Sequence, residues 1–292
     1  ADLYQQARDK GYCITRSYKE YQKRSKKADK MILLQSEEAS KVDRGGIPYA
    51  LDRQEGDLTL PDITRAAINF LTKKQGGKDG FFLMVEGGKI DWLCHANDVA
   101  FIPEIIEMDD AVKVAFEFYQ QHPDETLIVV TADHETGGLV LGRGGYQLNL
   151  QAVANQRMSI SRLGTELHKL HDKYGDKYDW EVAKAFLTDN FGFWDKVKLS
   201  DDQTARLQRS FQRVLEGKGV DAKSLYQKDS EFAGTVNRVM SECARLTWGT
   251  GGHTNGYVPC FSIGVGAEQL QGRLDNTELP VRIAKAAGWQ VR

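Results

Sequence analysis

Short apolar runs alternate with longer amphipathic stretches along much of this chain. The runs Met31–Leu34, Gly80–Val85 and Thr126–Thr131 lack the alternation of a half-buried strand, which predicts strands buried on both faces. Tyr12–Thr15 and Cys260–Val265 predict two further strands. The chain is therefore expected to contain a sheet whose faces are covered.

The stretches between these runs carry apolar residues at helical spacing. Helices are predicted over residues 2–10, from a cap at Ser17 to about residue 28, from Pro61 onward, over 99–121 and over 281–287. Apolar strands separated by helices are typical of parallel sheets with helices on both faces. We therefore predict an α/β fold with a mostly parallel sheet.

The character of the chain changes after Arg143. Residues 146–247 are polar, rich in Gln, Lys, Asp and Arg, and mostly helical in pattern. We interpret this segment as a helical insertion. The core of the α/β fold is then expected to comprise residues 1–145 together with residues 248–292.

The composition narrows the function classes. Lys and Arg number 39 against 41 Asp and Glu, a net charge of −2, so the chain carries no basic footprint for nucleic acid. It has no run of 18 apolar residues and therefore no predicted membrane span. The four cysteines are too widely spread for a zinc knuckle and too few for a disulfide scaffold.

The first cluster of candidate site residues directly follows the apolar run that ends at Val85. Glu86 comes next, and Asp91 and His95 lie four positions apart, so they share one face of a helical turn. Ligands bind beyond the carboxyl ends of strands in open α/β sheets. A carboxylate and an imidazole on one face are ligands that suit zinc or a similar divalent ion.

Two further clusters lie at the ends of predicted strands. Asp133 and His134 follow the run that ends at Thr131, where irregular backbone can bring both side chains onto one ion or two. His253 lies in a glycine-rich loop before the last strand, where glycines allow close backbone approach to a ligand. Taken singly, each cluster is more often a helix cap, a turn or a solvated imidazole. Three of them at strand ends favour a metal site.

These motifs resemble, in type and in order, those of the alkaline phosphatase family. The matching segments are Val85–Asp91 with His95, Thr131–His134 and Gly251–Thr254. The resemblance extends roughly from residue 2 to residue 289. It is poor over residues 146–247, where that family carries a variable crown insertion.

The resemblance implies two zinc ions and one magnesium ion. It implies that Asp91, His95 and His253 are the complete set of protein ligands of the first zinc. It also implies that Asp133 and His134 are two ligands of the second zinc. Two ions about 4 Å apart can stabilise the attacking and leaving oxygens of an in-line displacement.

The resemblance also gives roles to two residues near the first cluster. It implies that Glu86 is one ligand of the magnesium ion. Trp92 follows a zinc ligand at a position that varies between branches of the family, and we expect it to line the substrate pocket. There it would shape the phosphate site without adding positive charge.

The chain departs from the family pattern in its catalytic group. The family's nucleophilic serine lies in an Asp-Ser-Ala stretch upstream of these motifs, and no such stretch precedes Glu86. The only Asp-Ser pair, Asp229–Ser230, lies in the insertion and is rejected as the nucleophile. The Gly-Asp-Gly motif and the threonine ligand of the magnesium site are also missing. We therefore expect a C-terminal portion of an alkaline phosphatase, with no catalytic serine of its own.

The predicted function is metal-dependent hydrolysis of small-molecule phosphate monoesters, with this chain supplying zinc and magnesium ligands. By itself the chain is expected to be weakly active or inactive. Two alternatives remain open: a related phosphodiesterase or sulfatase, and a metal-binding fragment without catalysis. The resemblance also implies a periplasmic or secreted location and is compatible with a homodimer, and the charge balance predicts no nucleic-acid partner.

Overall fold

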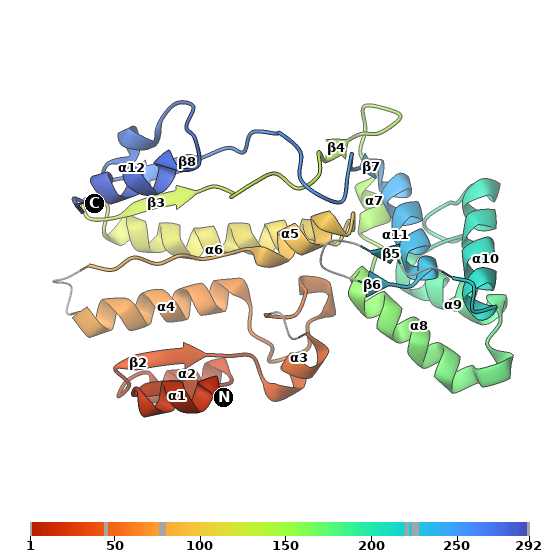
Figure 1. Ribbon diagram of the computed structural model, residues 1–292, viewed down its shortest axis with the longest axis horizontal. Helices are drawn as coiled ribbons and strands as arrows, with labels where there is room; N and C mark the ends of the chain where they lie inside the picture. The colour runs from red at the N-terminus through yellow and green to blue at the C-terminus, as the bar shows by residue number, and fades with distance from the viewer. Residues whose placement is uncertain (1, 44–45, 76–79, 220–221, 224–227, 291–292) are drawn as a thin grey trace.

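The computed structural model describes residues 2–43, 46–75, 80–219, 222–223 and 228–290 (Figure 1). The N-terminal region contains two short strands, β1 (Tyr12–Thr15) and β2 (Lys30–Leu33), which pair in parallel. Ser17 caps the helix between them, because its side chain accepts the N–H of Glu20. The strands and the cap agree with the sequence predictions.

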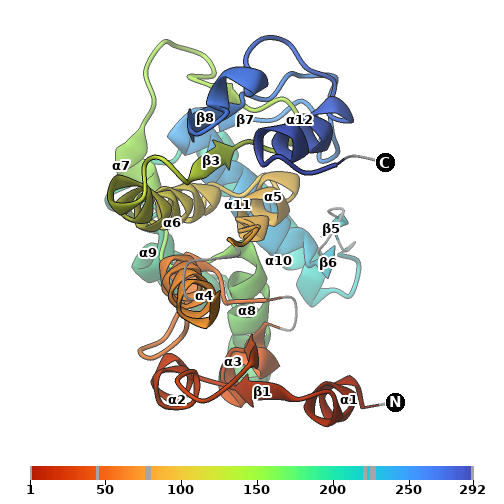
Figure 2. The same cartoon turned by 90° about the vertical axis from the view of Figure 1, so that its left-hand side faces the viewer.

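The helices of this region also follow the hydrophobic pattern. The long helices α4 (Leu60–Gln75) and α6 (Phe101–Gln121) contact one another, and Figure 2 shows both end on, between the β1–β2 pair and the C-terminal elements. A membrane-crossing helix, long and apolar throughout, is not found among the described residues. The α-helices of the described residues outside 146–247 are α1 (Leu3–Asp9), α2 (Tyr18–Arg24), α3 (Glu37–Val42), α4 (Leu60–Gln75), α5 (Gly88–His95), α6 (Phe101–Gln121) and α12 (Glu278–Ala286).

The predicted strand over Gly80–Val85 is wrong in one respect. The segment is extended and runs beside α4 and α6 (Figure 1), but it forms no ladder with another described strand. Its side chains at Phe82 and Met84 are 62% and 76% exposed. An apolar run favours extended backbone, but a strand also needs a neighbour for its N–H and C=O groups, and the run does not specify one.

Strand direction also differs from the expected mostly parallel sheet. Strand β3 (Leu127–Val130) pairs antiparallel with β8 (Phe261–Gly264), and β4 (Val140–Leu141) pairs antiparallel with β7 (Leu246–Thr247). The short pair β5 (Ala222–Lys223) and β6 (Lys228–Asp229) is also antiparallel. The apolar character of a strand reports burial and not direction, so sequence alone could not distinguish these pairings.

Residues 146–247 are mostly helical, as predicted, and their helices gather at one end of the molecule (Figure 1). Each helix begins at a residue whose side chain accepts a backbone N–H of the first turn. The helices are α7 (Leu150–Val153), α8 (Ile160–Tyr174), α9 (Trp180–Phe191), α10 (Asp201–Leu215) and α11 (Glu231–Ala244).

The hydrophobic core runs through these helices and on into α5. Phe191, Leu207 and Val236 from three of the helices are almost fully buried, and Leu93 of α5 joins the same cluster. The core therefore fixes α5 through its buried face. The division into an insertion at 146–247 and a core at 1–145 and 248–292 stays a prediction.

Candidate metal centre

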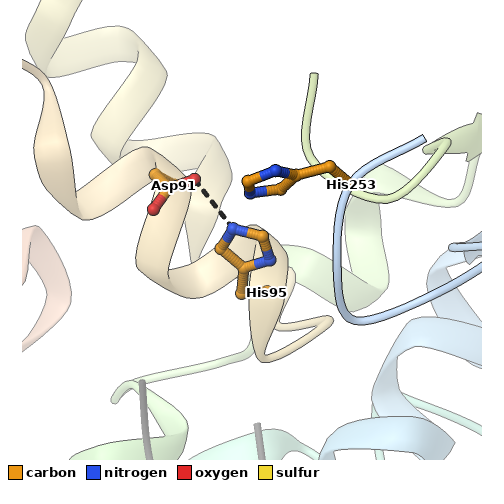
Figure 3. A group of neighbouring side chains, drawn as sticks. All are labelled: Asp91, His95 and His253. Carbon is orange, nitrogen blue, oxygen red and sulfur yellow. Dashed lines mark ion pairs between the residues drawn. The ribbon is translucent and has the colours of Figure 1, made fainter. Parts of the chain in front are cut away.

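Helix α5 presents Asp91 and His95 on one face, as their spacing predicts. Nε2 of His95 lies 3.0 Å from Oδ1 of Asp91, and the His95 side chain is fully buried (Figure 3). The Asp91 oxygen is itself buried and accepts no hydrogen bond from the described residues. A buried carboxylate oxygen without a hydrogen bond is costly unless a cation or a proton meets it.

The other ring nitrogen of His95 is held by backbone. Nδ1 lies 2.8 Å from the carbonyl oxygen of Gly251. Because a carbonyl only accepts, Nδ1 carries a proton, and Nε2 is the ring nitrogen that faces Asp91. A carbonyl behind a histidine is a common way of orienting a metal ligand. The contact also ties α5 to the glycine-rich loop.

The glycine-rich loop brings His253 to this pair. One ligand atom each from Asp91, His95 and His253 can be chosen so that all lie within 4.8 Å of one another. The ring centroids of His95 and His253 are 5.0 Å apart. Figure 3 shows the two rings and the carboxylate converging from α5 and the loop. The predicted ligand set of the first zinc is therefore assembled in space.

The second cluster lies against the first. Nε2 of His134 is 3.3 Å from Oδ2 of Asp133 and 4.0 Å from Oδ1 of Asp91. Nδ1 of His134 donates to the carbonyl of Glu135 at 2.9 Å, which leaves Nε2 as the ligand nitrogen. Asp133 is largely exposed, and its carboxylate adjoins the same space. The two residues predicted for a second ion thus border the first site.

Glu86 is not joined to this group. Its side chain is exposed and folds back over the start of α5, where a Cβ at Gly88 would lie 3.2 Å from its Oε1. Within the described residues, no hydrogen bond or ion pair connects Glu86 to the other five predicted ligands. Its assignment to magnesium stays a prediction.

Trp92 has a partner that the sequence analysis missed. The ammonium of Lys89 lies 4.0 Å from the centroid of the Trp92 ring and 4.3 Å from that of Tyr49. The same ammonium donates to Oδ2 of Asp43 at 2.6 Å. Burial lowers the pKa of Lys89, and the Asp43 carboxylate opposes that shift. A buried cation therefore lies behind the predicted pocket residue, whose role in the pocket stays a prediction.

A second missed residue is Glu135. Its Oε2 accepts the N–H of Gly138 at 2.6 Å, and its Oε1 accepts the N–H of Thr254. The hydrogen bond from Thr254 lowers the pKa of the Glu135 carboxyl. Its position in the sequence could have indicated this role, because Glu135 directly follows the predicted ligands Asp133 and His134 and lies just before two glycines.

The loops that carry His134 and His253 approach each other through glycine. The carbonyl of Gly137 accepts N–H groups from Gly249 at 2.8 Å and Thr250 at 3.2 Å. Gly137 has a φ of +90°, and a Cβ there would lie 2.2 Å from the carbonyl oxygen of Thr250. A side chain at this position would therefore force the two loops apart.

This donor set fits a zinc ion. Zinc binds imidazole nitrogen and carboxylate oxygen, and three such protein ligands leave a fourth position for water or substrate. The buried, hydrogen-bond-free oxygen of Asp91 and the oriented Nε2 of His95 meet this requirement. These three residues would thus hold a divalent ion, with His134 close to Asp91.

Comparison with known proteins places the chain in a family. The family model described as alkaline phosphatase matches residues 1–289. Alkaline phosphatase 3 of Bacillus subtilis is 33% identical over 250 residues, which cover 85% of this chain and 48% of that protein. The repressible alkaline phosphatase of Saccharomyces cerevisiae is 33% identical over 254 residues, covering 80% and 42%. The chain belongs to the alkaline phosphatase family, and it spans a little under half the length of these two relatives.

Solved structures agree on the fold. A cold-active alkaline phosphatase from a psychrophilic Shewanella matches with a TM-score of 0.74 and 25% identity over 98% of this chain and 62% of that one. The Thermus thermophilus alkaline phosphatase matches with a TM-score of 0.71 and 24% identity over 100% and 59%. A variant of the TAB5 alkaline phosphatase, which has Mg bound in its M3 site, matches with a TM-score of 0.53 and 22% identity. That match covers 100% of this chain and 56% of the TAB5 chain. These likenesses confirm the α/β fold class.

Proposed function

We propose that this chain provides the metal-binding part of a metal-dependent phosphomonoesterase. The observation that carries the proposal is the convergence of Asp91, His95 and His253, whose ligand atoms lie within 4.8 Å of one another. Membership of the alkaline phosphatase family supports the same reaction. The substrates would be small-molecule phosphate monoesters, and nucleic acid is not expected as a partner.

The residues present would hold the ions as follows. Asp91, His95 and His253 would bind the first zinc, and Asp133 with His134 would bind the second. When bound, such ions stabilise negative charge on the attacking and leaving oxygens of a phosphoryl transfer. The chain's own contribution is to direct the ligand atoms: Gly251 fixes the proton of His95 on Nδ1, and the Glu135 carbonyl does the same for His134.

Glu86 would provide one ligand of a magnesium ion. It is exposed two residues before α5, so its carboxylate is free to turn toward a hard cation. Trp92 would form a wall of the substrate pocket. The Lys89 ammonium packs on its ring and pairs with Asp43, which would hold this wall in place.

The nucleophile is not supplied by this sequence, because no Asp-Ser-Ala stretch precedes Glu86. That observation favours a second candidate, a metal-binding fragment without catalysis. We also propose a periplasmic or secreted location and a homodimer, both as expected of the family.

The test joins this chain to the nucleophile-bearing N-terminal part of the Bacillus subtilis relative. The zinc-loaded fusion is assayed with p-nitrophenyl phosphate at alkaline pH. We expect hydrolysis by the fusion, little or none by the chain alone, and none by the fusion with His253→Ala. A folded, zinc-loaded fusion without hydrolysis would leave only the metal-binding fragment. A higher rate on bis-p-nitrophenyl phosphate or on a sulfate ester would reassign the reaction.

A further inference from the structure

Two loops far apart in sequence meet at one carboxylate beside the metal centre. Glu135 belongs to the loop that carries His134, and Thr254 follows His253 in the glycine-rich loop. The carboxylate uses both oxygens: Oε2 accepts the N–H of Gly138 within its own loop, and Oε1 accepts the N–H of Thr254 across the junction. The backbone of both ligand-bearing loops therefore converges on one side chain.

The surrounding backbone leaves space for that side chain. A Cβ built at Gly256 would lie 2.9 Å from Cγ of Glu135, and one at Gly138 would lie 3.2 Å from Cγ2 of Thr254. Any larger residue at position 256 would push the carboxylate out of its position. The absence of a side chain at Gly256 is thus an independent sign that the contact is built into the site.

We propose that Glu135 is a positioning residue for the metal centre, which holds the His253 loop against the His134 loop and so sets the spacing of the ligands from both. The inference deepens the proposed function and rests on its metal site. Both of its oxygens accept N–H groups, and it does not belong to the group of possible ligands formed by Asp91, His95 and His253. Groups behind metal ligands commonly change metal affinity 10–100-fold when removed, about the effect expected here.

The chemistry of the contact predicts which substitutions fail. Both Glu135 oxygens accept N–H groups. A glutamine has only one acceptor oxygen, so in Glu135→Gln the NH₂ group faces one of the two N–H donors and that hydrogen bond is lost. Glu135→Asp keeps two acceptors, but its side chain is one methylene too short to span both loops. Gly256→Ala disturbs the same contact from the opposite loop without changing the glutamate itself, because the added Cβ displaces the Glu135 side chain.

The experiment titrates the full chain with Zn²⁺ in competition with a chelating dye, and records the visible absorption of bound Co²⁺ as a signature of ligand geometry. We expect Glu135→Gln and Gly256→Ala each to weaken zinc binding by about 10–100-fold and to change the Co²⁺ spectrum. The double variant should bind about as weakly as the single ones, because both act through one contact. Hydrogen exchange of the Thr254 amide should accelerate in Glu135→Gln.

Glu125→Gln serves as the matched control. Glu125 is exposed and contacts His122 beyond the other end of β3, so its loss should leave zinc binding unchanged. Unchanged zinc affinity and Co²⁺ spectrum in Glu135→Gln would overturn the inference. So would a weakening that only tracks a lower melting temperature of the metal-free protein. Absence of zinc binding in the unsubstituted chain would overturn the proposed metal site, and the inference with it. Absence of hydrolysis by the zinc-loaded fusion would count only against the proposed reaction.

Discussion

The rings of His134 and His253 stack with their centroids 3.6 Å apart and their planes 25° from parallel. The two histidines come from loops on either side of the helical segment 146–247, and the fold brings them together beside Asp91. Their ring nitrogens and the Asp91 carboxylate therefore border one small space. This relationship brings one histidine of the second cluster and the histidine of the third beside Asp91 of the first.

Removal of His253 should abolish tight zinc binding. In His253→Ala, the first site keeps only Asp91 and His95, and two protein ligands do not make a stable zinc site. Zinc titration by calorimetry measures the effect. His168→Ala is the control, because that side chain is 79% exposed on α8. Equal zinc affinity in His253→Ala and in the unsubstituted chain would show that the ion lies elsewhere.

Lys89→Met should destabilise the fold. Methionine fills the same apolar space against Tyr49 and Trp92, but it removes the Lys89 ammonium from the largely buried Asp43 carboxylate. Breaking such a pair costs about 3–5 kcal/mol, measured as the free energy of unfolding in urea. Adding Asp43→Asn should recover part of that loss. A double variant no more stable than Lys89→Met would mean that the ion pair is not the cause.

Asp98→Asn should also destabilise, for a hydrogen-bonding reason. Asp98 is fully buried, and its two oxygens accept N–H groups from Ala100, Gln156 and Ile160 at 2.7–3.0 Å. An amide must turn a donor toward one of these donors, at a cost of about 1–3 kcal/mol. Thermal unfolding measures it against the exposed control Asp124→Asn. Equal melting temperatures for Asp98→Asn and the control would show that the three hydrogen bonds to Asp98 do not stabilise the fold.

Glu104 should make stability depend on pH. Burial raises its pKa from 4.5 to about 7, Glu107 adds to the rise, and Arg53 and Lys89 oppose it. Between pH 4.5 and pH 7, the Glu104 carboxyl keeps its proton in the folded protein but loses it in the unfolded chain. Stability therefore falls as pH rises from about 4.5 to 7, by about 1–3 kcal/mol from this group.

Glu104→Gln tests that slope. Glutamine stays neutral, and its carbonyl can still accept the N–H of Ala50, which Glu104 holds at 2.6 Å. Urea unfolding at several pH values should show a flatter profile between pH 4.5 and 7 than in the unsubstituted chain. Glu117→Gln, an exposed change on the same helix, should keep the original slope. An unchanged slope in Glu104→Gln would assign the pH dependence to other groups.

The sequence predicted what short-range rules govern. Helix periodicity located α4 and α6, and the Ser17 cap followed from its side-chain chemistry. The four-residue spacing of Asp91 and His95 sufficed to put them on one face of α5. The resemblance to alkaline phosphatase, confirmed by the family match, predicted His253 as the third member of that group.

Long-range partners were beyond the sequence. The extended run Gly80–Val85 was predicted as a strand, but pairing depends on a neighbour that no local pattern names. Lys89 reaches Asp43 from 46 residues away, and Glu135 meets Thr254 from 119 residues away. Each is a tertiary contact between segments far apart in the sequence, and no local pattern predicts it.

Anomalous diffraction at the zinc edge, from crystals of the zinc-loaded chain, tests the metal centre most directly. We predict a peak bonded to Asp91, His95 and His253 at about 2.0–2.2 Å, with a fourth position facing His134. Crystals of His253→Ala grown under the same conditions should lack that peak. A zinc peak bound by other residues, or none near α5 in the unsubstituted chain, would contradict the proposed centre.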